Sequence, residues 1–493
     1  MAEEQLGKAY IEVYRQSIED PQDFWGEIAG ELHWYEKWDN VLDDSNPPFF
    51  KWFVGGKTNI CYNAVDRHAL GSFSSKAAII WESAEQGQSR VMTYYELYQE
   101  VNRFAGVLKN IGVKKGDRII IYLLMMPEAI IAMLSCLRIG AIHSVVFAGF
   151  SIEALANRIT DAKPKLLITA DTGLRRGQPV HLKEIVDKSL EIAPVKTVIV
   201  LNRGIVDVRM REGRDFYWDD QLKEKGEQYV EPAQLESTDP SYILYTSGTS
   251  GRPKGVVRDT GGYMVALYNS MRQIYDARDG DVYWATSDIG WVVGHSYIVY
   301  APLLYGISSV MFEGSPDYPD PGVLWSVVEK YGVSIMFSSP TAIRMLRKFS
   351  EKYIKRYDTS TLRYFFLAGE PLDEPTWKWV SDALGMKAID HYWQTESGWP
   401  MVSNMPGIEL LPMKPGSLAK PVVGYDFVIV DERGEPVPPG TKGYLMLKPP
   451  LPPGMLMTLW EDDEQYRQSY WQQFPGQMLY STGDYAIEDG DGY

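Results

Sequence analysis

The sequence has few of the features that mark secreted, nucleic-acid-binding or membrane proteins. Only two of its 493 residues are cysteine, and Cys61 and Cys136 lie far apart, so neither a disulfide framework nor a thiolate metal site is indicated. Basic residues number 49 against 65 acidic ones, and the net charge of −16 repels nucleic-acid backbones and anionic lipid surfaces. The acidic start does not resemble a targeting signal. We therefore predict a cytoplasmic protein that binds neither nucleic acid nor membrane.

Long apolar runs and several familiar catalytic motifs are also missing. The most apolar window, residues 119–147, is interrupted by Pro127, Glu128 and Arg138, which indicates buried strand, helix and strand rather than a membrane span. The sequence has no G-x-S-x-G elbow, no H-E-x-x-H zinc site and no G-x-x-x-x-G-K-[ST] loop. A serine hydrolase, a zinc protease and a Walker-type ATPase are therefore disfavoured.

The first half of the chain alternates between amphipathic helices and short apolar strands. Thr93 and Glu96 have the spacing of a helix capping box, and apolar residues recur at helical spacing as far as Ile111. The strands "RIIIYLL", "HSVVFA" and "KLLITA" follow, separated by a helix near residues 128–137 and another that begins at Ser151. Strands that are apolar on both faces are typical of a parallel sheet covered by helices, so an α/β fold is predicted.

The second half repeats this alternation after a polar, acid-rich stretch at about residues 203–238, which we interpret as a connector. From residue 414 onward, prolines and glycines multiply between short alternating strands, which is typical of a small β-rich unit. We therefore expect four segments. Residues 1–70 form an N-terminal extension, 71–238 and 239–413 form two α/β subdomains with mainly parallel sheets, and 414–493 form a β-rich subdomain.

The stretch "YTSGTSGRPKG", residues 245–255, predicts a loop that binds phosphate. Glycine allows several backbone N–H groups to turn toward one point, the Thr and Ser hydroxyls add donors, and Lys254 adds positive charge. A flexible surface turn between a strand and a helix has a similar composition, so this alternative stays open for the loop alone. The candidate phosphate-binding residues are Thr246, Ser247, Gly248, Thr249, Ser250, Gly251 and Lys254.

The whole eleven-residue pattern resembles the signature loop of the acyl-adenylate-forming enzymes, which include acyl-CoA synthetases, luciferases and peptide-synthetase adenylation domains. Three later motifs resemble, in order, this family's adenine-flanking turn ("LAGEP", residues 367–371), its adenine and magnesium segment ("YWQTESGWP", 392–400) and its ribose-binding carboxylate ("STGD", 481–484). Over essentially the whole chain, including the N-terminal extension, the sequence resembles the acetyl-CoA and propionyl-CoA synthetase branch. The segments "GVVRDTGGY", "FLAGEPLDEPT" and "LPPGMLMTLWEDDE" look closer to the propionyl-type enzymes.

This resemblance implies an AMP-forming acyl-CoA synthetase, a ligase that makes a carbon–sulfur bond from a small carboxylic acid, ATP and coenzyme A. Thr246 and Lys254 would act on the β- and γ-phosphates, Thr395 on the α-phosphate, and Glu396 on magnesium, which prefers oxygen ligands. Asp484 would accept both ribose hydroxyl protons. The adenine site would be lined by Gly369, Glu370, Pro371, Asp390, His391, Tyr392, Trp393 and Gln394.

The resemblance also places residues at the acyl pocket. Trp393 matches the tryptophan that bounds this pocket in acetyl-type enzymes, whereas Ala368 and Val293 stand where those enzymes carry Val and Thr. The smaller and less polar pair makes room for apolar bulk, which favours propionate, or a slightly longer or branched acid of up to six carbons, over acetate. Trp291 and Val292 complete the predicted wall.

Two further assignments leave alternatives open. His295 either shapes the entrance for the carboxylate or is an ordinary buried histidine. Arg175 and Arg176 resemble the segment that contacts the 3′-phosphate of coenzyme A, or they form a solvated basic turn. By the same resemblance, a mobile C-terminal domain that carries a catalytic lysine is absent from these residues.

We therefore expect the 493 residues, as the family's large N-terminal domain, to bind AMP or an acyl-adenylate but to turn over slowly. The alternatives are an adenylation domain that loads a carrier protein and a catalytically incomplete nucleotide-binding fragment. The sequence does not indicate an oligomeric state.

Overall fold

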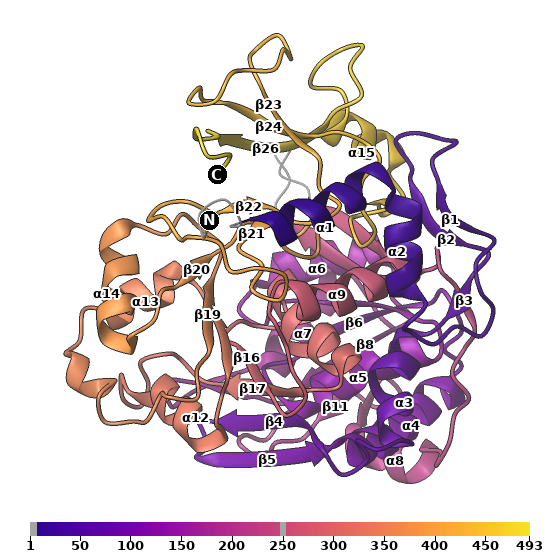
Figure 1. Cartoon of the computed structure of the whole chain (residues 1–493). Helices are drawn as coiled ribbons and strands as arrows, with labels where there is room; N and C mark the ends of the chain where they lie inside the picture. Colours follow the sequence, from indigo (N-terminus) through magenta and orange to yellow (C-terminus); the bar gives the residue numbers. More distant parts are fainter. Residues whose placement is uncertain (1–6, 247–252) are drawn as a thin grey trace.

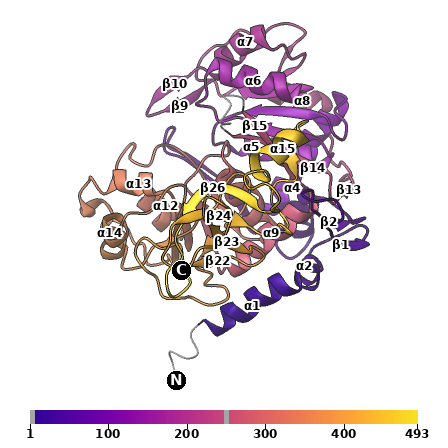
Figure 2. The same ribbon diagram turned by 90° about the horizontal axis from the view of Figure 1, so that it is seen from above.

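The computed structural model describes residues 7–246 and 253–493, which form two large sheets, a small sheet and the helices that cover them (Figure 1). The small sheet lies above the two large ones in the view of Figure 1, and Figure 2 shows the same arrangement from above. Among the described residues, no helix is long and apolar enough to cross a lipid bilayer.

The first large sheet has eight strands and is parallel from β12 to β14. The predicted α/β class with mainly parallel sheets is confirmed here, because only β15 and β25 run antiparallel to their neighbours. In spatial order the strands are β12 (Asp215–Tyr217), β11 (Val198–Leu201), β8 (Leu166–Ala170), β6 (Arg118–Tyr122), β7 (Ile142–Val145), β14 (Pro240–Thr246), β15 (Lys254–Asp259) and β25 (Thr458–Leu459).

The second large sheet has seven strands, all parallel except the β4–β5 hairpin at one edge. In spatial order they are β20 (Ile389–Asp390), β19 (Tyr364–Leu367), β18 (Ile335–Ser338), β16 (Val282–Ala285), β17 (Ser308–Glu313), β4 (Ala77–Ser83) and β5 (Gln88–Thr93). Each large sheet takes strands from both predicted α/β segments, since β4 and β5 precede residue 238 and β14 and β15 follow it. The boundary at 238/239 therefore separates stretches of chain but not sheets.

Helices cover these sheets, and their ends follow the local sequence. The capping box is present, because Thr93 Oγ1 accepts from the Glu96 amide while Glu96 accepts from the Thr93 amide. Ser151 likewise caps its helix through the amide of Ala154. The helices are α4 (Tyr94–Asn110), α5 (Pro127–Arg138), α6 (Ile152–Ala162), α7 (Leu182–Ile192), α8 (Trp218–Lys225), α9 (Gly261–Gln273), α10 (Val292–Gly294), the π-helix η3 (His295–Tyr300), α11 (Ala301–Tyr305), α12 (Val323–Tyr331), α13 (Pro340–Leu346), the 3₁₀ turn η4 (Glu351–Tyr353) and α14 (Glu374–Leu384).

The stretch predicted as a connector contains regular structure. Strand β12 and helix α8 both fall within residues 203–238, and β12 extends the eight-stranded sheet at its edge. Trp218 supplies the reason, because this buried ring stacks on Phe104 of α4 at a centroid distance of 3.7 Å. Leu222 of the same helix is buried as well, so two apolar side chains dock α8, and the polar composition of the stretch gave no sign of them.

The N-terminal extension wraps around the other segments. Its helix α1 packs on the β-rich segment, where Tyr10 Oη donates to the carbonyl of Pro421 (3.0 Å) and Tyr14 Oη donates to that of Tyr425 (2.9 Å). The elements are α1 (Lys8–Glu19), α2 (Pro21–Ala29), β1 (Asn40–Asp43), β2 (Lys51–Val54), β3 (Lys57–Thr58), the π-helix η2 (Tyr62–Asp66) and α3 (Arg67–Ala69), with β3 paired to β13 (Leu235–Glu236).

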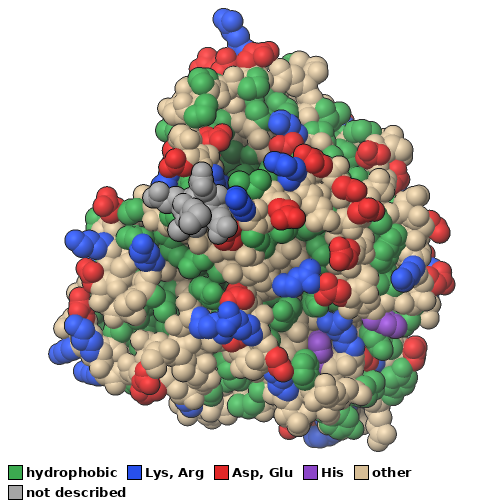
Figure 3. All heavy atoms as spheres, in the orientation of Figure 1, with side chains coloured by type: hydrophobic (Ala, Val, Ile, Leu, Met, Phe, Trp, Pro, Cys, Tyr) green, Lys and Arg blue, Asp and Glu red, His purple; other side chains and the backbone are tan. Residues whose placement is uncertain are grey.

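The C-terminal segment forms a three-stranded antiparallel sheet, as its alternating pattern predicts. Its strands are β23 (Phe427–Val430), β24 (Gly443–Leu447) and β26 (Tyr480–Ala486), accompanied by helix α15 (Asp463–Tyr470). Strand β25 leaves this segment to join the eight-stranded sheet. The short pairs β9 (Gly173–Arg175) with β10 (Gln178–Val180), and β21 (Val402–Ser403) with β22 (Lys420–Pro421), complete the fold. The space-filling view shows the surface hollowed below this small sheet (Figure 3).

Candidate active site

Two groups of predicted site residues follow neighbouring strands of the seven-stranded sheet. Residues 368–371 follow β19, and residues 391–394 follow β20, its parallel neighbour, so both groups lie at the same edge. His391 anchors the second group, because its Nδ1 donates to the carbonyl of Leu367 (2.7 Å) while its Nε2 lies 3.0 Å from Tyr275 Oη. Burial lowers the pKa of His391 to about 4. The imidazole is neutral at pH 7 and holds β19 and the segment after β20 together.

The predicted phosphate loop connects β14 and β15 of the other large sheet, which pair antiparallel. Thr246, the last residue of β14, pairs with Lys254, the first residue of β15. The Thr246 hydroxyl oxygen is buried and has no hydrogen-bond partner among residues 7–246 and 253–493. A buried hydroxyl without a hydrogen-bond partner destabilises the fold, so this position suits a residue whose partner is a bound anion. The other predicted loop residues, Ser247, Gly248, Thr249, Ser250 and Gly251, lie outside the described residues.

A tyrosine links the phosphate hairpin to the predicted magnesium residue. Tyr470, the buried last residue of α15, donates from Oη to Glu396 Oε1 at 2.8 Å. Lys254 Nζ lies 4.7 Å from the centroid of the same ring, within range of a cation–π interaction. Burial raises the pKa of the Tyr470 phenol, so it remains a donor. Lys254 and Glu396, which are 142 positions apart, therefore both contact Tyr470, one at its ring face and the other at its hydroxyl.

The predicted ribose carboxylate belongs to the same assembly. Asp484, an exposed residue of β26, accepts at Oδ2 from Tyr392 Oη (2.6 Å) and from Gln394 Nε2 (2.7 Å). Gln394 also donates to the carbonyl of Thr482 at 2.8 Å. These bonds hold Asp484 over the segment that carries Thr395 and Glu396. Tyr392 and Gln394 direct their polar atoms to this carboxylate, and their predicted adenine contacts stay a prediction.

Glu396 fits the coordination habits of magnesium. No cluster of three or more histidine, cysteine, aspartate or glutamate residues suited to a metal occurs in the described part of the chain. Mg²⁺ is typically bound through one or two carboxylates together with substrate phosphates and water, so a single carboxylate beside a phosphate loop suits it. Tyr470 occupies Oε1 of Glu396 and leaves Oε2 for a ligand.

A fully buried arginine holds the Thr395–Glu396 backbone from below. Arg258 of β15 donates to the carbonyls of Thr395, Glu396 (3.0 Å) and Gly454 (2.6 Å). Its guanidinium group also lies over the rings of Tyr242 and Tyr263, at 5.9 and 5.4 Å from their centroids. The three carbonyls replace the water that a buried cation loses. Arg258 therefore fixes the backbone of both predicted catalytic residues of this segment.

The predicted acyl wall combines residues that follow β19 and β20 with residues of α10 and η3. Trp393 packs edge-on against Tyr297 of η3 (centroids 5.4 Å apart) and lies 6.2 Å from Phe337 of β18. Val293 precedes Tyr297 by four positions, which places the two on one helix face. Ala368 is buried and bonded through its amide to the carbonyl of Ser338, the residue after Phe337. Trp393 thus packs on Tyr297 and Phe337, and Val293 and Ala368 lie close in sequence or in hydrogen bonding to these two aromatic residues.

The remaining predicted wall residues differ in exposure. Val292 is buried, whereas Trp291 is 46% exposed and packs against Phe147 and Phe150. His295 is fully buried, and its Nδ1 donates to the carbonyl of Trp291 at 3.1 Å. Burial lowers the pKa of His295 to about 4. Its environment is that of a neutral core histidine; its role at the carboxylate entrance stays a prediction.

The residues of the adenine turn are exposed or half-buried. Gly369 has φ of +108°, a conformation that favours glycine, and Pro371 is exposed. The carboxylate of Glu370 accepts from Thr341 and pairs with Arg344 of α13. Arg344 also pairs with Asp373, the N-cap of α14, at 3.1 Å. The turn is therefore held by α13 on one side and by α14 on the other.

The two arginines predicted for coenzyme A lie on the β9–β10 hairpin, and both are exposed. Arg176 pairs with Asp317 at 2.6 Å, and the amides of Arg176 and Gly177 donate to the carboxylate of Glu85, each at 2.8 Å. In the described part of the chain, no hydrogen bond or ion pair joins Arg175 or Arg176 to the predicted nucleotide site. Their assignment to coenzyme A therefore stays a prediction.

Comparisons with known proteins agree with this geometry. The profile of the AMP-binding enzyme family matches residues 66–460, and that of the acetyl-coenzyme A synthetase N-terminus matches residues 10–64. The chain belongs to the AMP-binding enzyme family. It is 50% identical to the acetyl-coenzyme A synthetase of Pyrobaculum arsenaticum, over 98% of this chain and 74% of that protein. The predicted family and branch are confirmed.

Two further relatives carry other substrate names. The propionate–CoA ligase of Escherichia coli is 46% identical, over 98% of this chain and 77% of the relative. The 3-hydroxypropionyl-coenzyme A synthetase of Sulfurisphaera tokodaii is also 46% identical, over 98% of this chain and 74% of the relative. The relatives' names thus include acids of two and of three carbons.

Sequence reasoning missed two residues of the site. Arg258 stands in a motif used only to choose the branch, and its single signal is an arginine within the apolar strand "KGVVRD". Tyr470 has no sequence signal, because it lies in a polar helix and meets Glu396 only through the tertiary fold. Neither residue was assigned a role before the structure placed it.

Asp390 provides a test of pH dependence. It is 9% exposed, its Oδ1 has no hydrogen-bond partner among the described residues, and burial raises its pKa to about 7. In the unfolded chain the same carboxyl has a pKa of about 3.9, so at a pH between the two pKa values only the folded state binds the proton. Its contribution to the free energy of unfolding is therefore lost as pH rises from about 4 to about 7. Asp390→Asn mimics the neutral acid and is expected to gain up to about 4 kcal/mol over wild type between pH 4 and 8.

Urea unfolding at a series of pH values measures this difference. Asp382→Asn on α14 is the matched control, because Asp382 is exposed and water solvates its carboxylate in both states. The stability difference for the control should change little with pH. If the stability difference between Asp390→Asn and wild type also stays constant with pH, Asp390 is not buried in its neutral form.

Proposed function

We propose that this chain acts in an AMP-forming short-chain acyl-CoA synthetase, which joins a small carboxylic acid to coenzyme A at the expense of ATP. The observation that carries the proposal is the assembly of Lys254, Glu396 and Asp484 around the segment of residues 392–396. Lys254 meets Glu396 through Tyr470, and Asp484 meets the same segment through Tyr392 and Gln394. These three charges suit the phosphates, the metal and the ribose of one nucleotide.

The reaction needs positioning and charge neutralisation more than a covalent nucleophile. A carboxylate oxygen of the acid attacks the α-phosphorus of ATP, the bond to the bridging oxygen breaks, and pyrophosphate leaves with its electron pair. The thiol of coenzyme A then attacks the acyl carbon, loses its proton and displaces AMP. Lys254 and the Thr246 hydroxyl would hold the departing phosphates, and Thr395 would contact the α-phosphate. Magnesium, held through Glu396, supplies charge neutralisation when bound.

For the acid, we propose a propionate-like substrate. Trp393 limits the length of the chain, and Ala368 and Val293 leave apolar space beside it. The hydrogen bond from the Ala368 amide to the carbonyl of Ser338 and the packing of Trp393 on Tyr297 support a pocket of fixed size. The names of the relatives, which include acetate-like and propionate-like acids, agree with a short chain.

A panel of straight and branched acids of two to six carbons tests this proposal. With magnesium, ATP and coenzyme A present, we expect the release of AMP and pyrophosphate to be fastest with a three- or four-carbon acid. Trapping with hydroxylamine in the absence of coenzyme A measures the formation of the acyl-adenylate separately from its transfer to the thiol. Acetate as the best acid would refute the pocket argument, and pyrophosphate release in which only a carrier protein serves as final acceptor would refute the acyl-CoA synthetase.

Ala368→Val is expected to shift acid preference toward acetate. The two added methyl groups occupy the space that the third carbon of the acid would fill. Losing the space for one methylene group changes kcat/KM by about tenfold or more. We therefore expect kcat/KM for propionate to fall about tenfold while that for acetate changes little. Ala383→Val on α14 makes the same change away from the site and should leave the ratio unaltered. If Ala368→Val lowers kcat/KM equally for both acids, Ala368 does not line the acyl pocket.

A further inference from the structure

Two of the segments that look closer to the propionyl-type enzymes meet the predicted adenine and magnesium segment in one buried cluster. Arg258 comes from "GVVRDTGGY", Gly398 and Trp399 from "TESGWP", and Gly454 from "LPPGMLMTLW". Arg258 donates to the carbonyl of Gly454 at 2.6 Å, and Trp399 Nε1 donates to that of Pro453 at 3.1 Å. All of these side chains are fully buried. Stretches separated by up to about 200 positions thus form one structure, which we call the arginine cluster.

The arginine cluster leaves no room for a side chain at Gly398 or Gly454. Gly398 has φ of +77°, and a Cβ at this position would lie 2.8 Å from Cζ of Arg258. Gly454 has φ of +84°, and its Cβ would lie 2.7 Å from the Cβ of Ala266. Real Cβ atoms do not come this close, so any larger residue would push the backbone or Arg258 aside.

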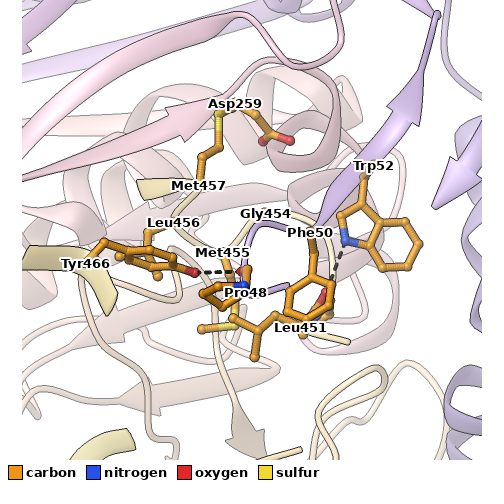
Figure 4. Close-up of a pocket in the computed structure, with 11 residues that line it drawn as sticks. Pro48, Phe50, Trp52, Asp259, Leu451, Gly454, Met455, Leu456, Met457 and Tyr466 are labelled. Atoms are coloured by element: carbon orange, nitrogen blue, oxygen red, sulfur yellow. Dashed lines mark hydrogen bonds between the residues drawn. The ribbon is translucent and has the colours of Figure 1, made fainter. Parts of the chain in front are cut away.

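The segment that carries Gly454 is also held from its other side. Trp52 Nε1 donates to the carbonyl of Leu451 (3.1 Å), and Tyr466 Oη donates to that of Pro48 (3.3 Å). Figure 4 shows Trp52 and Tyr466 on opposite sides of residues 451–457, with Asp259 beyond Met457. Trp52 thus holds this segment at Leu451, while Tyr466 joins the N-terminal extension to α15. At the other end, the Met457 amide donates to the carbonyl of Val257 in β15 (3.0 Å), so the Gly454 carbonyl lies between two fixed points.

A serine connects the arginine cluster to the acyl wall. Ser296 Oγ donates to the carbonyl of Gly398 at 2.6 Å and lies 2.8 Å from Tyr263 Oη. Ser296 lies on η3 beside Tyr297, whose ring packs on Trp393, and three positions after Val293. The Gly398 carbonyl thus fixes the distance between the helix that bears Val293 and the segment that bears Trp393.

From these contacts we infer that Arg258, Gly398 and Ser296 are positioning residues that set the acyl-chain length accepted by the enzyme. Arg258 and Ser296 hold residues 395–398 against η3, so that Trp393 closes the pocket at one fixed distance from Val293. None of the three has to touch the acid. This inference rests on the proposed function, because it concerns the acyl pocket of the same site.

Gly398→Ala and Ser296→Ala test the inference, with Gly385→Ala as matched control. Gly385, at the end of α14, has φ of +69° but no atom within 4 Å of an added Cβ, so the control carries the backbone strain of Gly398→Ala without the contact to Arg258. The readout is the ratio of kcat/KM for propionate to that for pentanoate. We expect Gly398→Ala to lower this ratio about tenfold and Ser296→Ala about threefold, whereas Gly385→Ala leaves it unchanged.

The outcomes separate this inference from the proposed function. A wild-type protein that forms no acyl-hydroxamate with any acid refutes the function itself. If wild type is active and both variants lose kcat/KM equally for both acids, as a merely structural role requires, the positioning inference is overturned. Ser296→Ala removes only one hydroxyl, so it provides a folded variant if Gly398→Ala does not fold, and a thermal melt of each variant checks folding.

Discussion

Glu396→Gln is expected to slow acyl-adenylate formation about 10²–10³-fold. The substitution keeps the size of the side chain and its contact with Tyr470 but removes the negative charge proposed to bind magnesium. Removing one group aimed at charge that develops in a transition state costs a factor of this size. Hydroxylamine trapping with saturating acid and ATP measures the rate. The affinity for ATP in the presence of magnesium, measured by calorimetry, should fall as well, and the magnesium concentration needed for half-maximal rate should rise.

The matched control is Glu464→Gln, which removes an exposed carboxylate from the same helix as Tyr470. Glu464 lies 3.8 Å from Arg467 in a surface pair that contributes little, so rate and magnesium dependence should stay within about twofold of wild type. A Glu396→Gln enzyme with unchanged magnesium dependence would show that this carboxylate does not hold the metal. Tyr470→Phe gives an intermediate case, since it removes one hydrogen bond to Glu396 and leaves the charge.

Arg138→Met is expected to lower the free energy of unfolding by about 3–5 kcal/mol. Arg138, at the end of α5, donates to both carboxylate oxygens of Asp66 at 2.8 and 3.0 Å and to the carbonyl of Val230 at 2.6 Å. Both side chains are buried, at 0% and 2% exposure. The substitution leaves the Asp66 carboxylate buried without its partner, which is the costly way to break an ion pair. Urea unfolding at pH 7 measures the loss.

Arg15→Met is the matched control, because Arg15 and its partner Glu19 are at least 65% exposed and 3.8 Å apart. The loss there should stay below about 0.5 kcal/mol. The double variant Arg138→Met/Asp66→Leu removes both buried charges and is expected to recover most of the stability. If the double variant is as unstable as the sum of the two single ones, the pair is not coupled, and the N-terminal extension is held by other contacts.

Much of the fold is local and could be predicted from the sequence. The capping box at Thr93 and Glu96, the cap at Ser151 and the helix near residues 128–137 depend on residues within one or two turns, and the structure has all three. The apolar strands of the two large sheets were predicted for the same reason, because buried parallel strands are apolar on both faces. The family followed from four ordered motifs, each of them a short stretch of chain.

Pairings between distant parts of the chain could not be predicted in this way. Strands β4 and β5 belong to a sheet whose other strands all come after residue 281 in the sequence. Strand β25 pairs with β15, which lies about 200 positions earlier. Nothing in the period of an apolar strand specifies its partner. Tyr470 and Arg258 were missed for a related reason, since each acts through a carboxylate or carbonyl more than 70 positions away. The motifs indicated the reaction, whereas the residues that position Thr395 and Glu396 became evident only from the fold.

The most direct measurement compares the affinities of AMP, propyl-AMP and hexyl-AMP by calorimetry. In the two alkyl esters, a stable phosphoester replaces the reactive anhydride of the acyl-adenylate. Three carbons buried beside Trp393, Val293 and Ala368 are each worth about 0.8 kcal/mol, so we expect propyl-AMP to bind about 10–50-fold more tightly than AMP. Hexyl-AMP should bind more weakly than propyl-AMP, because the indole closes the pocket. Equal affinity for AMP and propyl-AMP, or no binding of AMP, would contradict the proposed site and its reaction.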